Sequence, residues 1–314
     1  MKRVIKCRLT NTILFLICLG FLTAIFMPAP GHTLSVTSSG TASIDWSLVT
    51  FSQTLNFIDP VVGDTRTSFS GAQVQLNGVQ TDFAVGSDFN TIPVPWANTS
   101  IDASISNATG SAIGHADTGL YGAPPGAPVP FDPASPLAAN RIFASVNNAL
   151  NSPGSAGLTG GVPNQANAAL TGIFTSATGG ALTVTVPYSL ALSLFSDTAF
   201  GNAAADVFAG LFLFGIDPIS GLPFDDPLAS APAELHNFIS GIASFSASSN
   251  GTLTLTFNNL VANTPYDFEA WATAQATAAT PEPATLFLLG SGLIGLGTTL
   301  RRRFKKEGVQ KSSS

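Results

Sequence analysis

The amino-acid sequence predicts an all-β body with the architecture of a β-sandwich or jelly roll. Short runs in which apolar and small polar residues alternate recur along the middle of the chain, and Gly, Pro, Asn and Asp residues separate them. No long stretch of this body has the periodicity of an amphipathic helix. Apolar segments flank the body on both sides, so we expect an N-terminal signal helix and a C-terminal single transmembrane helix.

Residues 1–33 have the pattern of an export signal. Four basic residues occupy the first eight positions, and the strongly apolar run 13–27 follows them. The pattern does not define one cleavage site, because Pro30 follows Ala29, and an uncleaved anchor is the alternative interpretation. Both cysteines of the chain lie in this segment, so we expect a body without disulfides or thiolate metal sites.

Strand-like alternation is clearest in the second half of the body. Leu182, Val184 and Val186 share one face of an expected strand, and the dense apolar run 207–216 is typical of a central strand. We expect strands at 181–186, 188–195, 207–216, 244–247, 252–257 and 266–271, with looser alternation at 44–57, 68–85 and 100–113.

Several segments interrupt this strand pattern. Asn250-Gly251 predicts a tight hairpin turn, and the segments 137–150 and 165–171, which are Ala-rich and lack Gly, predict short helices. The Pro-rich segment 122–136 is predicted to be a surface loop of one sandwich or, alternatively, a linker between two halves. Residues 272–280 are uncharged and rich in Ala and Thr, so we expect a stalk there.

The charge of the exported body, residues 34–279, excludes two classes of partner. This segment contains two basic residues, Arg66 and Arg141, against sixteen acidic residues, which gives a net charge of about −14. Binding to nucleic acid or to anionic lipid requires clustered cations, so neither is expected. The negative charge favours solubility, cation binding or self-repulsion in an extracellular setting.

The body shows no catalytic motif, and we assign no catalytic residue and expect no enzyme. It has no GxSxG or HExxH string, and its two histidines, His115 and His236, are not spaced as paired ligands. His115 lies two residues before Asp117 and is predicted to form a polar surface pair with it.

An acidic loop is the one candidate for a metal site. Asp217, Asp225 and Asp226 lie among Gly and Pro residues, and oxygen-rich loops of this kind can bind Ca²⁺. The spacing differs from that of an EF-hand, and Asp before Pro is a common turn starter. Turn formation is therefore the main interpretation, with calcium as the alternative and no other cofactor expected.

Three tryptophans, Trp46, Trp96 and Trp271, are candidates for stacking on sugar rings. Packing in the core is the main interpretation for each of them. The N-glycosylation sequons at Asn98, Asn107 and Asn250 carry little weight in a chain so rich in Asn, Ser and Thr.

The C-terminal tail has three parts in a fixed order. Its apolar run, residues 284–300, is 17 residues long, so a helix would measure ~25 Å, at the short limit for a bilayer. A buried core helix is the alternative, but it would need neither the prolines before the run nor the cations after it. The GxGxxG string at 290–295 lies inside the run and is discarded as a dinucleotide site. Pro281, Glu282 and Pro283 precede the run, and Arg301, Arg302, Arg303, Lys305 and Lys306 follow it.

This tail resembles the PEP-CTERM sorting signal of Gram-negative bacteria, which a membrane protease-transpeptidase of the exosortase family processes. The resemblance implies that Pro281, Glu282 and Pro283 are the recognition element, within a sorting signal and anchor at 280–306. The basic cluster would stop transfer and leave a short cytoplasmic tail at 307–314. The protein would thus be exported, held transiently in the inner membrane and then released to the cell surface.

The resemblance also associates the protein with biofilm and exopolysaccharide. It implies a structural or adhesive role in the extracellular matrix, with the protein as the substrate of the sorting enzyme. The alternative is a secreted carbohydrate-binding protein, or a polysaccharide-acting enzyme on a jelly-roll scaffold. The enzyme would require two carboxylates that face each other across a cleft.

Overall fold

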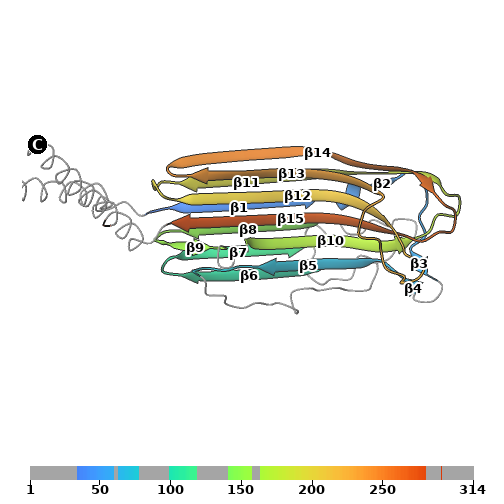
Figure 1. Ribbon diagram of the computed structural model, residues 1–314, viewed down its shortest axis with the longest axis horizontal. Coiled ribbons are helices and arrows are strands. Elements are labelled where there is room, and N and C mark those ends of the chain that lie inside the picture. Colours follow the sequence, from blue (N-terminus) through green and yellow to red (C-terminus); the bar gives the residue numbers. More distant parts are fainter. Residues whose placement is uncertain are drawn as a thin grey trace, which may run out of the picture. The chain divides into compact units, whose positions relative to one another are not determined.

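The computed structural model describes residues 34–59, 63–77, 99–118, 141–157, 163–280 and 291. These residues form two antiparallel sheets packed as a sandwich, which confirms the expected all-β architecture (Figure 1). The predicted signal segment 1–33, the Pro-rich segment 122–136, Trp96 and the tail from Pro281 onward lie outside the described residues, except for Ser291, which is helical. Within the described ranges, no helix is long and apolar enough to cross a membrane.

The first sheet has seven strands. They are β1 (Val36–Ile44), β2 (Thr50–Phe51), β6 (Ser100–Asn107), β7 (Gly110–Asp117), β8 (Ile142–Leu150), β11 (Gly180–Ser196) and β14 (Ala243–Leu260). Their order is β14-β11-β1-β8-β7-β6, and the short β2 also pairs with β11. A 3₁₀ turn, η1 (Trp46–Leu48), follows β1.

The second sheet has six strands. They are β5 (Thr67–Gln73), β9 (Gly154–Ala156), β10 (Asn164–Phe174), β12 (Asn202–Gly215), β13 (Ala229–Ser240) and β15 (Tyr266–Thr280). Their order is β13-β12-β15-β10-β5, and β9 pairs with the end of β15. A separate two-stranded ribbon consists of β3 (Ile58–Asp59) and β4 (Gly63–Asp64).

Small residues fill the middle of the core, where the two sheets lie close together. The inward positions of β15 are alanines from Ala270 to Ala278, all of them buried, and they face β1 and β8. A Cβ atom added at Gly40 of β1 would lie 2.6 Å from Val207 Cγ1 of the opposite sheet. Some Cα atoms of β1 and β15 approach within 8 Å, which is closer than the ~10 Å usual for stacked sheets.

This packing corrects the prediction of a stalk at 272–280. The segment is the second half of β15, and it pairs with β12 on one side and with β10 and then β9 on the other. Its alternation of Ala with Thr and Gln is a strand pattern in which only a methyl group fits the inner face. A segment so poor in large apolar residues resembles a linker when it is considered by itself. The close approach of the opposite sheet explains why its buried positions are alanines.

The two predicted helices are also wrong. Residues 142–150 of the first belong to β8, and 165–171 of the second lie within β10. Alanine favours a helix locally, but Ala144, Ala166 and Ala168 point into the narrow core between the sheets. Tertiary pairing therefore overrides a local preference of a few tenths of a kcal/mol per residue.

The predicted hairpin turn at Asn250-Gly251 is a third correction. β14 continues through these residues and pairs with β11 from Ala243 to Leu260. Gly251 lies beside the ring of Tyr188, where a Cβ atom would be 3.0 Å from Tyr188 Cε1. The glycine makes room for a tyrosine on the neighbouring strand, and the chain does not turn there.

The aromatic core side chains gather toward one end of the sandwich. Trp46 is fully buried, which confirms core packing for this tryptophan, and its ring lies 6.0 Å from that of Phe268. Phe174 and Tyr266 stack with their ring centroids 5.9 Å apart. We call this end, which carries the connections 216–228 and 261–265, the loop end.

The first strand, β1, begins and the last strand, β15, ends at the opposite end, which we call the terminal end. Val36 pairs with Ser196, and Ala279 pairs with Asn202. Thr280 is buried, and its hydroxyl accepts a hydrogen bond from the backbone N–H of Gly154 at 2.8 Å. The last strand therefore stays in the sheet up to the residue before Pro281.

Candidate functional site

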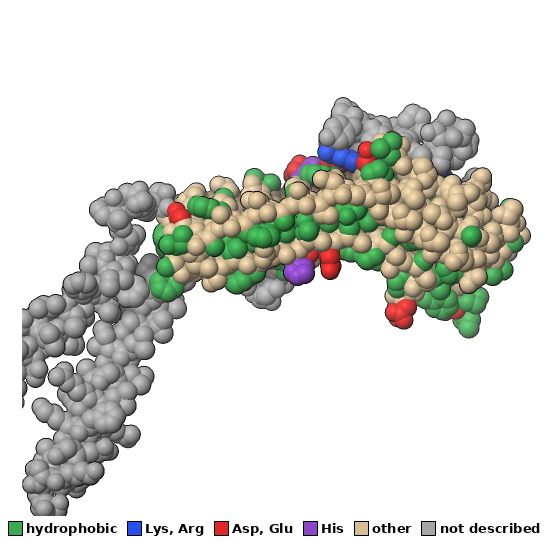
Figure 2. Space-filling view, turned by 90° about the horizontal axis from the view of Figure 1, so that it is seen from above, with side chains coloured by type: hydrophobic (Ala, Val, Ile, Leu, Met, Phe, Trp, Pro, Cys, Tyr) green, Lys and Arg blue, Asp and Glu red, His purple; other side chains and the backbone are tan. Residues whose placement is uncertain are grey.

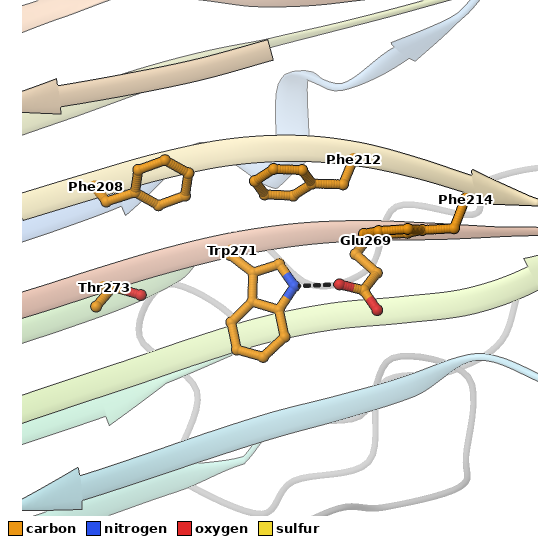
Figure 3. A pocket seen from close by; sticks show the side chains of 6 residues that line it. All are labelled: Phe208, Phe212, Phe214, Glu269, Trp271 and Thr273. Atoms are coloured by element: carbon orange, nitrogen blue, oxygen red, sulfur yellow. Dashed lines mark hydrogen bonds between the residues drawn. The ribbon is translucent and has the colours of Figure 1, made fainter. Parts of the chain in front are cut away.

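A shallow groove lies on the outer face of the second sheet, over β12 and β15 (Figure 3). Its volume is about 260 Å³. Successive side chains of a strand point to opposite faces, so the inward positions of these strands are buried and the positions between them line the groove. The lining residues are Phe208, Phe212 and Phe214 of β12 with Glu269, Trp271 and Thr273 of β15.

The three phenylalanines form a row of nearly parallel rings. The ring centroids of Phe208 and Phe212 are 5.9 Å apart with planes at 20°, and those of Phe212 and Phe214 are 6.2 Å apart with planes at 26°. Gly210 lies between the first two, and a Cβ atom there would be 2.5 Å from Phe208 Cζ and 2.9 Å from Phe212 Cε2. The missing side chain therefore allows both rings to lie flat over the strand.

Trp271 extends this row across the sheet. Its ring centroid lies 5.7 Å from that of Phe69 on β5, with Ala169 between them on β10. Its indole Nε1–H donates a hydrogen bond to Glu269 Oε2 at 2.7 Å, drawn as the dashed line in Figure 3. This bond fixes the orientation of the indole, because a rotated ring would lose its acceptor.

Asp267 and Glu269 form a carboxyl pair at one end of the aromatic row. Asp267 is only 7% exposed, and burial, together with the charge of Glu269 and a hydrogen bond to it, raises the pKa of Asp267 to about 7. The backbone N–H groups of Gly172 and Phe268 donate to the carboxylate and oppose this rise. Near neutral pH Asp267 is therefore protonated in about half of the molecules, so its carboxyl can donate a hydrogen bond in one form and accept in the other.

The pair does not have the geometry of a glycosidase. The two carboxyls lie on the same strand and hydrogen-bond to each other, whereas glycoside hydrolysis needs carboxyls ~5–9.5 Å apart on two sides of the sugar. The groove can therefore hold a ring against its aromatic floor but does not place an acid and a base across a bond.

The expected pair of His115 and Asp117 is present and belongs to a larger cluster on the first sheet. His115 Nδ1 lies 2.7 Å from Asp102 Oδ1, and its Nε2 lies 2.8 Å from Asp117 Oδ2. Arg141 donates to both oxygens of Asp117, at 3.0 Å from Nε and 2.6 Å from Nη2, and its guanidinium lies over the ring of Phe143.

The electrostatics of this cluster favour a charged histidine. The hydrogen bond to Asp117 raises the pKa of His115, against the effect of its partial burial. Burial opposes ionisation of Asp117, but hydrogen bonds from His115 and Arg141 outweigh it and lower the pKa of Asp117. With both ring nitrogens facing carboxylates, His115 has no free nitrogen to act as a base, and the cluster works as a clamp between β6, β7 and the start of β8.

The structure does not bring the three predicted calcium ligands together. Asp217 accepts hydrogen bonds from the backbone N–H of Ile219 and from the N–H and hydroxyl of Ser220, and the bond from Ile219 is the main reason that its pKa is lowered. Asp225 and Asp226 lie further along the same loop. In the part of the chain that the structure describes, no three His, Cys, Asp or Glu side chains form a metal-binding group.

The sequence contains a signal for the groove within the run 207–216. This run predicts a central strand, and apolar residues occupy its odd and even positions alike. The phenylalanines at 208, 212 and 214 share one parity, and so do Glu269 and Trp271. A row of one parity that combines aromatic rings with a carboxylate indicates a partly exposed face.

The fold and the groove define an all-β sandwich body with an aromatic outer surface, followed without a linker by a C-terminal signal. Residues 279–303 match the family model of the PEP-CTERM protein-sorting motif. The chain therefore carries this sorting motif, which begins within the last two residues of β15. The motif implies export, sorting to the cell surface, and processing by an exosortase, a membrane enzyme, with the protein as its substrate.

No curated protein matches the chain. Among solved structures, the VP2 subviral particle of infectious bursal disease virus is similar at 12% identity over 82% of this chain and 84% of that chain, with a TM-score of 0.12. The structure of the Gx strain of the same virus is similar at 11% identity over the same shares, with a TM-score of 0.09. TM-scores this low carry no argument about fold or function.

Proposed function

We propose that the protein is an exported component of the cell surface or extracellular matrix that holds a polysaccharide in its aromatic groove. The apolar run 284–300 anchors the precursor in the inner membrane until an exosortase removes it. The body then acts as a structural or adhesive element of the matrix, without catalysis of its own. The observation that carries the proposal is the outward row of Phe208, Phe212, Phe214 and Trp271.

The groove has the two kinds of contact that a sugar ring needs. Aromatic rings contact the C–H faces of a sugar, and Trp271 is held rigid for this purpose by Glu269. The carboxyl of Glu269 and the hydroxyl of Thr273 supply hydrogen-bonding groups beside the rings.

The charge of the body favours a glycan without negative charge. The ionisable residue in the lining of the groove is Glu269, and the whole body carries about −14. Figure 2 shows the molecule turned by 90°, and on that side too charged side chains appear in a few separate groups while most of the described area is uncharged. A polyuronate or a sulfated glycan would be repelled, whereas a neutral polysaccharide meets hydrogen-bonding groups and apolar rings.

The position of the groove suits a protein anchored by its C-terminus. Residues 267–273 lie seven to thirteen residues before Thr280 on the same strand. At about 3.4 Å per residue this places the groove roughly 25–45 Å from the terminal end. The groove is therefore clear of the anchor before and after processing.

Binding of isolated matrix polysaccharide, measured by affinity electrophoresis, tests the proposal. The probes are the exopolysaccharide of the producing cells, a neutral β-glucan and a polyuronate. Trp271→Ala should weaken binding to the neutral glycan about tenfold, because the lost indole contact corresponds to about 1–2 kcal/mol. Gly210→Val should weaken it too, because the added side chain displaces Phe208 without removing an aromatic ring.

Phe195→Ala is the matched control, since Phe195 is an exposed phenylalanine on the outer face of the first sheet. This variant should bind as the wild type does. If no probe is retained by the wild type, or if all three variants bind equally well, the groove is not a glycan site.

A further inference from the structure

The terminal end of the sandwich exposes a set of large apolar side chains, which we call the apolar collar. Ile242, in the turn between β13 and β14, is 74% exposed, and Phe238 is 61% exposed. The collar residues come from β11, the β11–β12 connection, β13, the β13–β14 turn and β14, and all lie within a few residues of that end. They are Phe195, Phe200, Phe238, Ile242 and Phe245.

The length of chain beyond Thr280 limits how far this end can be from a membrane. β15 keeps its pairing through Thr280, and the apolar run begins at Ala284. The three residues 281–283 span at most about 14 Å between Thr280 and Ala284. If the run 284–300 spans the bilayer, the terminal end lies at the height of the lipid headgroups.

We infer that, in the precursor, the terminal end docks on the outer surface of the bilayer with the apolar collar in the headgroup region. This inference rests on the proposed membrane anchor. Exposed Phe and Ile side chains gain free energy when their apolar surface leaves water for the boundary between headgroups and acyl chains. The occupant of the collar is therefore lipid, and the strands rise from the membrane with the groove away from it.

The distribution of charge agrees with lipid as the partner. Asp197 is the one acid in the described connections at the terminal end, and its Oδ1 accepts a hydrogen bond from the backbone N–H of Ser35 at 2.6 Å. The loop end also exposes apolar residues, among them Ile219 at 94%, but Asp217, Asp225 and Asp226 lie in the same loop. Carboxylates disfavour contact with an anionic membrane surface.

Docking of the terminal end on the bilayer affects how the sorting motif is presented to the enzyme. A docked sandwich holds residues 281–283 at the bilayer surface, where a membrane enzyme can reach them. Docking also limits rotation of the body about its anchor, so the motif is presented in a restricted orientation. Once the tail is cut, the collar is the remaining contact with the membrane, and the body can leave.

Lipid-dependent quenching in the full chain tests the inference. The two cysteines Cys7 and Cys18 are replaced by serine, and Ile242→Cys is labelled with an environment-sensitive fluorophore. The protein is reconstituted in phosphatidylethanolamine–phosphatidylglycerol vesicles that contain a headgroup-proximal spin-labelled lipid. Quenching should be several-fold stronger at position 242 than at the control Ile219→Cys, an equally apolar residue of the loop end.

A second set of variants separates docking from mere tethering. Phe200→Ser with Phe238→Ser should reduce quenching at position 242 by half or more, because the collar loses two rings. Circular dichroism should be unchanged, since both side chains are exposed. Equal quenching at 242 and 219, no effect of the two serines, or energy transfer between copies without lipid quenching would overturn the docking. Release of the precursor by carbonate would overturn the anchor itself, which is a distinguishable result.

Discussion

Replacing Asp267 by asparagine should stabilise the protein above neutral pH. Burial and the neighbouring Glu269 raise the pKa of Asp267 from 3.8 to about 7. Asparagine has the same shape as the protonated carboxyl and keeps an oxygen for the backbone N–H groups of Gly172 and Phe268. The variant therefore keeps these contacts and removes only the cost of ionisation.

The direction in which stability changes with pH follows from proton linkage. A carboxyl with a raised pKa binds its proton more tightly in the folded state, so between pH ~4 and ~7 the folded protein holds more protons than the unfolded chain. The free energy of unfolding falls as the pH rises through this window and is level above it. At about 1.4 kcal/mol per pH unit, the loss of unfolding free energy over this window is about 4 kcal/mol at most. Part of this loss belongs to Glu269, because the two carboxyls interact. We expect Asp267→Asn to gain roughly 2–4 kcal/mol at pH 8.5 and almost nothing at pH 4.

Urea unfolding followed by tryptophan fluorescence from pH 4 to 8.5 measures this difference. The raised pKa of His115 also makes stability fall as the pH rises above 6.5, but this contribution is common to both proteins and cancels in the comparison. Asp206→Asn, a change at an exposed acid on the outer face of β12, is the matched control. A gap between variant and wild type that does not depend on pH would refute the reasoning.

Three further outcomes are expected. Changing residues 281–283 to Ala-Ala-Ala should leave export intact but abolish the processed form, and mass spectrometry should find a membrane-bound precursor heavier by roughly 3 kDa, the mass of about 30 tail residues; normal release would contradict the sorting role. If the acidic loop binds Ca²⁺, millimolar calcium should raise the melting temperature, and Asp225→Ala with Asp226→Ala should abolish the rise; identical melts with calcium and chelator would dismiss it. His115→Gln should lower the free energy of unfolding by about 1–3 kcal/mol at pH 5, where the imidazolium pairs with Asp117, and by less at pH 9; an equal loss at both pH values would contradict a charged His115.

Local sequence determined those parts of the protein whose physical cause is local. Leu182, Val184 and Val186 were expected on one face, and all three are fully buried on β11. The order of Pro-Glu-Pro, apolar run and cations was sufficient for the sorting motif, because such a signal is read as a short linear segment. The net charge of the body and its lack of cysteine follow directly from a count of its residues.

Only the tertiary structure decided the role of the small residues. Residues 272–280 suggested a stalk and Asn250-Gly251 suggested a turn, yet both segments lie within continuous strands. Whether these segments form strands depends on what faces their small residues. The opposite sheet faces residues 272–280, and the ring of Tyr188 lies beside Gly251. Residues that provide the opposite surface come from distant parts of the chain, so no local window contains the cause.

The groove could not be predicted from the sequence for the same reason. Phe208, Phe212 and Phe214 occur in a run that is apolar at odd and even positions, so the sequence did not distinguish an outer aromatic face from a buried one. The pairing of β12 with β15 places these rings beside Glu269 and Trp271, which lie more than fifty residues away in the chain. The sequence alone determined the chemistry of each residue, whereas the register between strands decided which residues share a surface, because non-local hydrogen bonds set that register.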